Sequence, residues 1–243
     1  MKVAYQTDVG QQRSDNQDRV AQFTNALGNQ LFLIADGIGG NRGGDVAAET
    51  TVNRFGLRFT EAGPETPLEA IRWFAREAQL VNDEILKKSK ENTQYHGMGT
   101  TLVAAMSFPD TLVVTNIGDS RGYLLHDGLM TQVTIDHSLV NELVKNGDIT
   151  EEEALKMPQR NIITRAIGIS SDAQVEVNRF KFESGDLLFM CSDGLSKTVD
   201  KESLKEVLTS DESVADKCSR LIKMANEAGG PDNITVLIGI NDK

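Results

Sequence analysis

Four aspartates stand beside short apolar segments that have the length and composition of β-strands. Three of them follow such a segment and the fourth precedes one: Asp36 follows 31–35, Asp119 follows 112–117, Asp193 follows 187–191, and Asp232 precedes 233–240. If the last strand runs antiparallel to the other three, all four carboxylates can meet at one edge of a sheet assembly.

Such a meeting of carboxylates favours a metal site. Four carboxylates that converge without basic neighbours repel one another strongly when they are partly buried. Divalent cations remove this repulsion, and ligands that are all oxygen select hard ions such as Mg²⁺, Mn²⁺ or Ca²⁺. Zinc is not favoured, because His96, His126 and His137 are scattered and lack ligand spacing. The pattern by itself predicts a divalent-metal site and no particular reaction.

An Asp-Gly pair after a single strand more often marks a turn than a ligand. Asp127-Gly128 is such a pair, because strand-like segments flank it on both sides, as in a hairpin. For Asp36, Asp193 and Asp232 together, each next to an apolar segment, the metal site is the better interpretation.

Short strands separated by turn signals dominate the chain. We predict strands at 2–6, 30–35, 100–108, 111–117, 121–126, 129–135, 174–182, 186–191 and 233–240. Pro109-Asp110 and Asp127-Gly128 connect neighbouring strands too closely for a parallel crossover, so these pairs must be antiparallel.

Three helix starts are recognisable at Thr66, Thr150 and Ser213, because each is a capping residue with Glu or Asp three positions later. The helix after Thr150 is predicted to stop at Pro158, and the helix after Ser213 near Gly229. A meandering antiparallel sheet with separate helices predicts the α+β class. Because no linker-like stretch interrupts the 243 residues, we expect one domain over 1–243.

The formal net charge is −11, from 25 Lys and Arg against 36 Asp and Glu. A field of this sign repels nucleic acid and anionic membranes, so we expect neither as a partner. Cys191, in an apolar run, is expected to be a reduced thiol. The N-terminus turns polar early, and no apolar segment approaches the ~20 residues that span a bilayer. These features predict a cytoplasmic protein, and we expect a monomer.

Seven motifs follow one another along the chain. They are Thr7-Asp8-x-Gly10-x-x-Arg13-x-x-Asn16-Gln17-Asp18, Ala35-Asp36-Gly37-x-Gly39-Gly40, Gly97-Met98-Gly99-Thr100-Thr101, Gly118-Asp119-Ser120-Arg121, Asp136-His137-Ser138, Ser192-Asp193-Gly194 and Gly229-Gly230-x-Asp232-Asn233. In this order they resemble the metal-dependent Ser/Thr protein phosphatase family of the 2C type, in its bacterial form, from residue 7 to about 240. The resemblance implies a four-layer α-β-β-α sandwich of two antiparallel sheets flanked by helices, with a metal cleft at one end.

The resemblance also implies two bound Mn²⁺ or Mg²⁺ ions and a possible third. Asp36 would bridge the two ions. The carbonyl of Gly37 would bind one of them, and Asp193 and Asp232 would bind the other. Asp119 would support the third, weaker ion together with Asp193.

By the same resemblance, Arg13 would bind the substrate phosphate and Asp18 would order metal-bound water. A two-metal site lowers the pKa of a bridging water and so supplies hydroxide near neutral pH. An arginine can donate two parallel hydrogen bonds to phosphate oxygens. The metal ions also explain how an acidic protein binds a phosphate ester. The implied reaction is hydrolysis of phosphoserine and phosphothreonine on proteins, with a Ser/Thr kinase and its targets as partners.

Some positions differ from relatives of this family. Ile38 and Asn41 stand where relatives carry histidines, so the general acid is not identified. Gln17 stands where some members carry Glu, and we expect it to contact metal through water. The segment 137–165 is expected to form a flap over the site, and its charged residues could read the substrate or form a solvated helix face.

Three other interpretations need a test. The run from Gly118 to Gly122 matches the nucleophile elbow of serine hydrolases, but an elbow must lead into a helix, and 121–126 is predicted to be a strand. A regulatory metal-binding module without catalysis would have no need of Arg13. Hydrolysis of small phosphomonoesters in place of phosphoproteins stays open.

Overall fold

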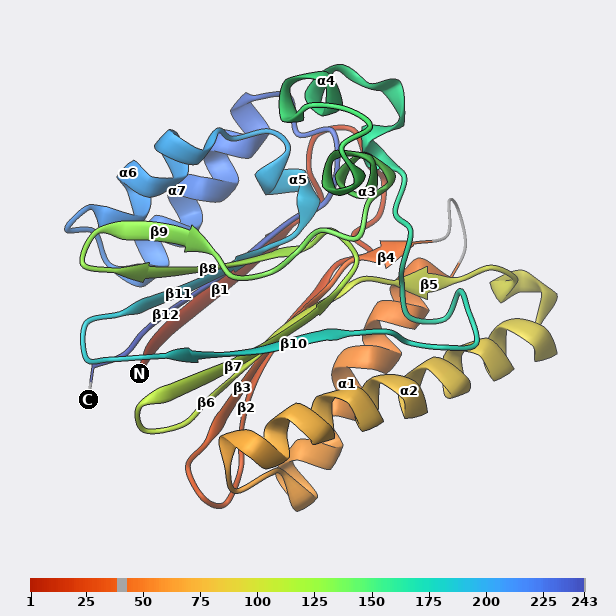
Figure 1. The fold of residues 1–243 in the computed structure, drawn as a ribbon, viewed down its shortest axis with the longest axis horizontal. Coiled ribbons are helices and arrows are strands. Elements are labelled where there is room, and N and C mark those ends of the chain that lie inside the picture. Colours follow the sequence, from red (N-terminus) through yellow and green to blue (C-terminus); the bar gives the residue numbers. More distant parts are fainter. Residues whose placement is uncertain (39–42, 243) are drawn as a thin grey trace.

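The computed structural model describes residues 1–38 and 43–242, and its centre is a pair of antiparallel sheets that pack face to face (Figure 1). The first sheet has the strand order β1-β12-β11-β8-β9, and the second has the order β10-β7-β6-β3-β2. The strands are β1 Lys2–Asp8, β2 Arg19–Thr24, β3 Gln30–Ala35, β4 Gly37–Ile38, β5 Gly99–Thr100, β6 Leu102–Ser107, β7 Thr111–Ile117, β8 Arg121–His126, β9 Leu129–Gln132, β10 Glu176–Lys181, β11 Leu187–Cys191 and β12 Ile234–Ile240.

Helices cover the outer face of each sheet, which confirms the predicted four-layer α-β-β-α sandwich. The helices are α1 Gly44–Ala62, α2 Pro67–Glu91, α3 Leu139–Asn146, α4 Glu151–Lys156, α5 Asp193–Ser196, α6 Lys201–Thr209 and α7 Val214–Glu227, with short 3₁₀ turns at Thr93–Tyr95 and Pro158–Asn161. Helices α1 and α2 pack on the second sheet, and α6 and α7 pack on the first (Figure 1). None of the helices among the described residues is both long and apolar enough to pass through a membrane.

The central strands are buried on both faces, which explains their continuous apolar sequences. In β3, Leu31 and Leu33 face α1 and α2, whereas Phe32 and Ile34 face the other sheet. Neighbouring side chains of a strand point to opposite faces, so a strand covered on both sides is apolar at every position. The strand β11 repeats this arrangement in the first sheet.

The strand directions bring the predicted aspartate positions to one end of the sandwich. Strand β12 runs antiparallel to β11, so the start of β12 lies beside the end of β11. Strands β3 and β7 are both antiparallel to β6, so their C-terminal ends point the same way. The last strand, β12, therefore has the antiparallel direction that the aspartates need in order to meet at one edge.

The segment 100–108, predicted to be one strand, is divided in the structure. Strand β5 pairs with β4, and β6 begins after a break at Thr101. The backbone N–H of Thr101 donates to the carbonyl of Asp36 at 2.9 Å, and its hydroxyl accepts from the N–H of Asp36 at 3.1 Å. The break therefore provides hydrogen-bond partners for the backbone where Asp36 leaves the sheet.

Other differences from the sequence prediction have local causes. Helix α1 was not predicted, because Gly43 stands at its N-cap and makes no side-chain cap hydrogen bond. The predicted strand 129–135 ends at Gln132, because the hydroxyl of Thr134 turns to accept from the backbone N–H of Gly122. The three helices predicted from capping residues are present as α2, α4 and α7.

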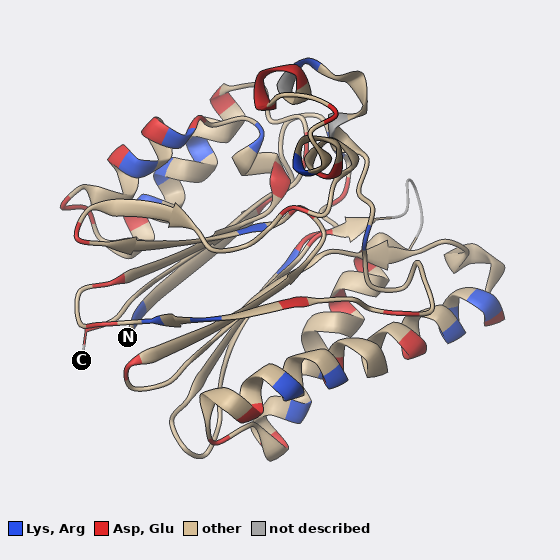
Figure 2. Cartoon of the chain, viewed as in Figure 1, with Lys and Arg blue, Asp and Glu red and all other residues tan. Residues whose placement is uncertain are grey.

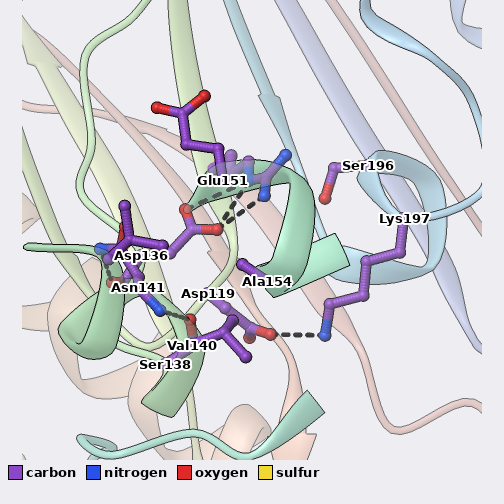
Figure 3. A pocket seen from close by; sticks show the side chains of 11 residues that line it. Asp119, Asp136, Ser138, Val140, Asn141, Glu151, Ala154, Ser196 and Lys197 are labelled. Atoms are coloured by element: carbon purple, nitrogen blue, oxygen red, sulfur yellow. Dashed lines mark hydrogen bonds and ion pairs between the residues drawn. The ribbon is translucent and has the colours of Figure 1, made fainter. Parts of the chain in front are cut away.

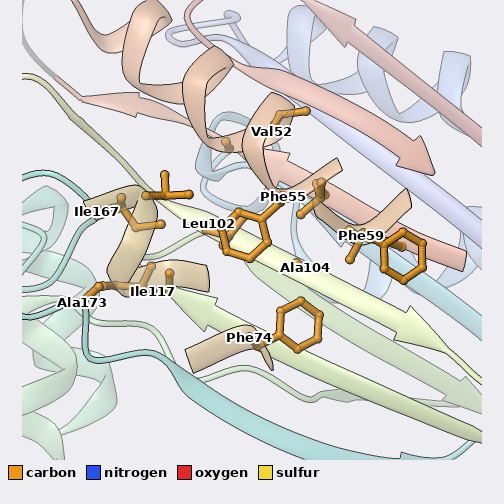
Figure 4. Close-up of a cluster of buried hydrophobic side chains, with 14 of the residues drawn as sticks. Val52, Phe55, Phe59, Phe74, Leu102, Ala104, Ile117, Ile167 and Ala173 are labelled. Carbon is orange, nitrogen blue, oxygen red and sulfur yellow. The ribbon is translucent and has the colours of Figure 1, made fainter. Parts of the chain in front are cut away.

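We expect Phe55→Ala to lower the free energy of unfolding by about 3–5 kcal/mol. Phe55 is fully buried between α1, α2 and the second sheet (Figure 4). Its ring meets Trp73 edge-on with centroids 5.6 Å apart. Urea denaturation followed by circular dichroism measures the change. The matched control is Leu57→Ala on the same helix, where the side chain is 47% exposed and a loss below about 0.5 kcal/mol is expected. Equal losses in the two variants would contradict the assigned core.

Candidate metal centre

A cleft of about 520 Å³ opens at the end of the sandwich where the aspartate-bearing strands meet. Five of the seven predicted site residues line it: Arg13, Asp36, Gly37, Asp193 and Asp232. Asn161 and Ile163 of the segment 137–165 also line this cleft. Figure 2 shows acidic residues from several segments meeting at this end, beneath α3 and α4.

Both sheets contribute carboxylates to the site. Asp36 and Asp119 follow β3 and β7 of the second sheet, and Asp18 directly precedes β2 of the same sheet. Asp193 follows β11 as the first residue of α5, and Asp232 precedes β12 in the first sheet. The site therefore depends on how the two sheets pack against each other.

Asp36 lies at the centre of this charge cluster. Burial raises its pKa well above the usual value, and the negative charges of Asp18, Asp193, Asp119 and Asp232 raise it further. Each carboxylate therefore disfavours ionisation of the others, and the cluster needs cations to stay fully charged.

Three carboxylate oxygens are buried without a hydrogen-bond partner among the described residues. They are Oδ1 of Asp18, Oδ1 of Asp119 and Oδ1 of Asp193. A buried carboxylate oxygen without a donor is costly in free energy, and a hard divalent ion satisfies it. The donor set, which is all oxygen, fits Mg²⁺ or Mn²⁺ on this observation.

Asp18 is buried behind the cleft and its side chain is fixed in orientation. Its Oδ2 accepts hydrogen bonds from the hydroxyls of Thr235 at 2.6 Å and Ser192 at 2.8 Å. Burial, opposed by these two hydrogen bonds, raises its pKa from 3.8 to about 7. The free Oδ1 is thereby held in one direction while the carboxyl can carry a proton near neutral pH.

Gly37 is a position where only glycine fits. A Cβ added there would lie 2.4 Å from the backbone carbon and oxygen of Gly44 and 2.9 Å from the carbonyl oxygen of Gln17. The absence of a side chain lets three backbone segments meet beside Asp36. Gly37 also lines the cleft.

The expectation that the carboxylates lack basic neighbours is wrong. The ammonium of Lys197 lies 2.7 Å from Oδ2 of Asp119 and 2.7 Å from Oδ2 of Asp193. Burial lowers the pKa of Lys197, but the two carboxylates raise it more, so that it lies above its usual value. The spacing from Asp193 to Lys197, one helical turn, is the signal in the sequence that could have revealed this contact.

Arg13 also pairs with a carboxylate of the cluster. Its Nη2 donates to Oδ2 of Asp232 at 2.8 Å, and its side chain is about half exposed. In this arrangement no three Asp, Glu, His or Cys side chains among residues 1–38 and 43–242 surround one point closely enough to hold an ion. Metal binding at Asp232 therefore requires that its carboxylate, now paired with Arg13, turn toward the ion.

Asn233 positions the loop that carries Arg13, a role that sequence reasoning missed. Its Nδ2 donates to the carbonyls of Val9 and Asp15 at 2.9 Å each, and its Oδ1 accepts from the backbone N–H of Gln17 at 2.8 Å. The loop between β1 and β2 is thereby tied to the start of β12, next to Asp232.

One alternative from the sequence, a serine nucleophile, loses its structural basis. Ser120 is buried, its hydroxyl bonds to that of Thr101 at 2.8 Å, and the chain continues into strand β8, so it is no nucleophile elbow. Asp127 has a positive φ of 49° and precedes Gly128 in the turn between β8 and β9, as expected for a hairpin.

The segment 137–165 leaves and re-enters the sandwich at one narrow neck. The backbone N–H of Thr164 donates to the carbonyl of His137 at 2.9 Å, and that of Leu139 donates to the carbonyl of Ile162 at 2.9 Å. Between these ends, α3 has no buried residue, and the acidic start of α4 is exposed.

Ile38 is partly buried and lines the cleft, and its aliphatic side chain has no proton to donate. Asn41 and the glycines at 39 and 40 lie outside the described residues, as does the side chain of Arg160.

Comparison with known proteins gives a consistent result. The family model described as Protein phosphatase 2C matches residues 8–235. The chain is 40% identical over 244 residues to Protein phosphatase PhpP of Streptococcus pneumoniae, covering 100% of this chain and 99% of that protein. The S. agalactiae serine/threonine phosphatase has a TM-score of 0.93 and 39% identity, over 98% of both chains. The catalytic domain of the phosphatase PstP, in complex with two manganese ions, has a TM-score of 0.85 and 34% identity, over 98% of this chain and 96% of that one.

We expect the metal-free protein to lose stability as pH rises from about 4 to about 7. Over this range the folded state holds a proton on Asp18 that the unfolded chain has released, because burial raises its pKa to about 7. The free energy of unfolding should fall by up to about 1.4 kcal/mol per pH unit for this group. Denaturation in EDTA at several pH values measures the slope.

Asp18→Asn should make this slope shallower, whereas Asp172→Asn, at an exposed position, should leave it unchanged. A slope that is the same in the wild type and in Asp18→Asn would contradict the assignment to Asp18.

Proposed function

Since the chain belongs to the protein phosphatase 2C family, we propose that its aspartate cluster is the two-metal centre with which it hydrolyses phosphoserine and phosphothreonine on proteins. The chain is a metal-dependent serine/threonine phosphatase, and the ions of its family are Mn²⁺ and Mg²⁺. One observation carries the assignment of the site: strand ends of both sheets bring the carboxylates of Asp36, Asp193 and Asp232 to one cleft, and the buried Oδ1 of Asp193 there lacks a hydrogen-bond donor among the described residues.

The proposed ligands follow from their positions on the cleft. Asp36, at the centre of the cluster, would contact both ions. The carbonyl of Gly37 would bind one ion, and Asp193 and Asp232 would bind the other. Asp119 lies next to this set, and its carboxylate could serve a third ion only in competition with Lys197.

When bound, the two ions supply a nucleophilic water of lowered pKa and neutralise charge on the phosphoryl group. Asp18 would accept a hydrogen bond from that water through its free Oδ1, because Ser192 and Thr235 hold the other oxygen in place.

Arg13 would bind the phosphate of the substrate. It is half exposed, it lines the cleft, and Asn233 ties its loop to the start of β12. Its guanidinium already binds one oxyanion, the carboxylate of Asp232. With Asp232 serving as a metal ligand, Arg13 would lose part of that attraction and could turn its two parallel N–H groups to phosphate oxygens.

We propose that the whole chain, 1–243, is one catalytic domain with the segment 137–165 as a flap over the cleft. Asn161 and Ile163 support this role, because both line the cleft. The charged residues of α4 are exposed and available to a protein substrate.

The partners of the enzyme follow from the chemistry of its substrate. Phosphoserine and phosphothreonine arise by phosphoryl transfer from ATP, so a Ser/Thr kinase must supply the substrates, and the kinase and its targets are the proposed partners. We place the enzyme in the cytoplasm, where ATP is available to such a kinase. A monomer is proposed because one chain contributes all the residues assigned to the cleft.

The other functions left open by the sequence are not favoured. PhpP, the matched relative of almost equal length, is a protein phosphatase, which argues against a non-catalytic metal-binding module and against small phosphomonoesters as the main substrates.

Hydrolysis of a phosphothreonine peptide is expected to require Mn²⁺ and to stop in EDTA. Asp193→Asn should lower turnover on the order of 10²–10³-fold, because the ion loses a charged ligand that stabilises the transition state. The matched control is Asp127→Asn in the β8–β9 turn, which should keep wild-type turnover. Turnover that survives EDTA would contradict the two-metal mechanism, and the ratio of kcat/KM for the peptide and for a small phosphate ester tests the substrate class.

Arg13→Lys should lower kcat/KM for the phosphopeptide by about 10-fold or more, because lysine cannot make two parallel hydrogen bonds to phosphate. Binding of Mn²⁺ should not weaken, because the arginine competes for Asp232. Steady-state kinetics and a Mn²⁺ titration measure the two effects. Arg72→Lys, on the exposed side of α2, is the control. An Arg13→Lys variant with weaker Mn²⁺ binding and unchanged kinetics would contradict the proposed role.

A further inference from the structure

Lys197 lies between two carboxylates that the family resemblance assigns to a third metal ion. Its ammonium is 2.7 Å from Oδ2 of Asp119 and 2.7 Å from Oδ2 of Asp193 (Figure 3 shows the contact with Asp119). The lysine side chain is 24% exposed and that of Asp119 only 2%, so this is a mostly buried ion pair. We propose that Lys197 is a built-in cation that takes the place of the third ion, so that this phosphatase binds two divalent ions and not three. The proposal rests on the metal centre proposed above.

The position of Lys197 is set by the backbone around it. It is the C-cap of α5, and its backbone N–H donates to the carbonyl of Asp193 at 2.9 Å. Thr198 secures the same turn, because its hydroxyl donates to the carbonyl of Gly194 at 2.7 Å. The lysine side chain therefore starts one helical turn from Asp193, on the side that faces Asp119.

The two carboxylate oxygens of Asp193 have different surroundings. Oδ2 of Asp193 accepts from Lys197, whereas Oδ1 is buried and has no hydrogen-bond partner among the described residues. One oxygen is thus available for an ion in the cleft while the other binds the ammonium. Lys197 can keep its place when the two-ion centre is filled.

Asp119 is separated from the cleft and has Lys197 as its cation. It lines a neighbouring cavity of about 360 Å³ together with Lys197 and Arg121 (Figure 3). Arg121 is engaged elsewhere, because its Nε and Nη2 donate to Oδ2 of Asp136 at 2.9 and 2.7 Å. Lys197 is therefore the cation in contact with Asp119, through Oδ2.

A third divalent ion and the ammonium exclude each other at this place. An ion bound to the same two oxygens would need contacts of about 2.0–2.2 Å to each of them. It would lie within a few ångströms of the ammonium, which makes 2.7 Å contacts to the same atoms. Two cations that close repel strongly in a partly buried site. Removal of the lysine charge should therefore open the site to an ion.

The test counts bound Mn²⁺ ions in the wild type, in Lys197→Met and in Lys201→Met. Lys201 is exposed at the start of α6 and gives the same change in net charge. We expect two ions in the wild type, three in Lys197→Met and two in Lys201→Met, by native mass spectrometry and by isothermal titration. In EDTA, Lys197→Met should unfold at a lower temperature than the wild type, and Mn²⁺ should raise its melting temperature by more.

A wild type that binds three ions, or a Lys197→Met variant that binds two, would overturn the proposal and leave the two-metal centre intact. A wild type that binds no ion would instead overturn the proposed centre itself. Asp119→Asn keeps the lysine, so this variant tests the proposal if Lys197→Met does not fold. It should still bind two ions, because Asp119 holds an ammonium, and the loss of one ion in this variant would also overturn the proposal.

Discussion

The mutual repulsion of carboxylates at the junction of two sheets is the constraint on which this structure depends. Asp18, Asp36 and Asp119 come from one sheet, and Asp193 and Asp232 come from the other. Burial raises the pKa of Asp36 well above the usual value, and the neighbouring carboxylates raise it further. The apolar packing of the sandwich holds the carboxylates together against this repulsion, and the cations of the site are what make the arrangement favourable.

The rigidity of the sandwich explains how such a cluster is kept in place. The central strands are buried on both faces, and side chains such as Phe32 and Leu188 fill the space between the sheets. Well-packed cores of this kind resist displacement, so the strand ends remain in position even when the charges repel. Function at one end of the molecule is therefore supported by burial along its whole length.

Many of the strands, turns and helices were predictable from the sequence, because the signals for them are local. The apolar runs of β3 and β11, the turn at Asp127 and the caps at Thr66 and Ser213 each act within a few residues, and the structure contains all of these elements. Of the four aspartates at predicted strand ends, Asp36, Asp193 and Asp232 line one cleft. Helix α1 escaped prediction because its start has glycine where a capping side chain is usual.

Contacts that depend on register between distant segments were not predictable. Arg13 meets Asp232 from a position 219 residues away, and Lys197 meets Asp119 from 78 residues away. The hydrogen bonds of Asn233 that fix the Arg13 loop are of the same kind. No periodicity in the sequence encodes such pairs, because they arise only when both sheets are complete.

The narrow neck of the segment 137–165 has an evolutionary consequence. Because the chain leaves at His137 and returns at Thr164 beside its point of departure, the strands on either side need not move when this segment changes in length or composition. Substitutions in the exposed helices α3 and α4 can therefore accumulate while the strand ends that carry the carboxylates stay in place.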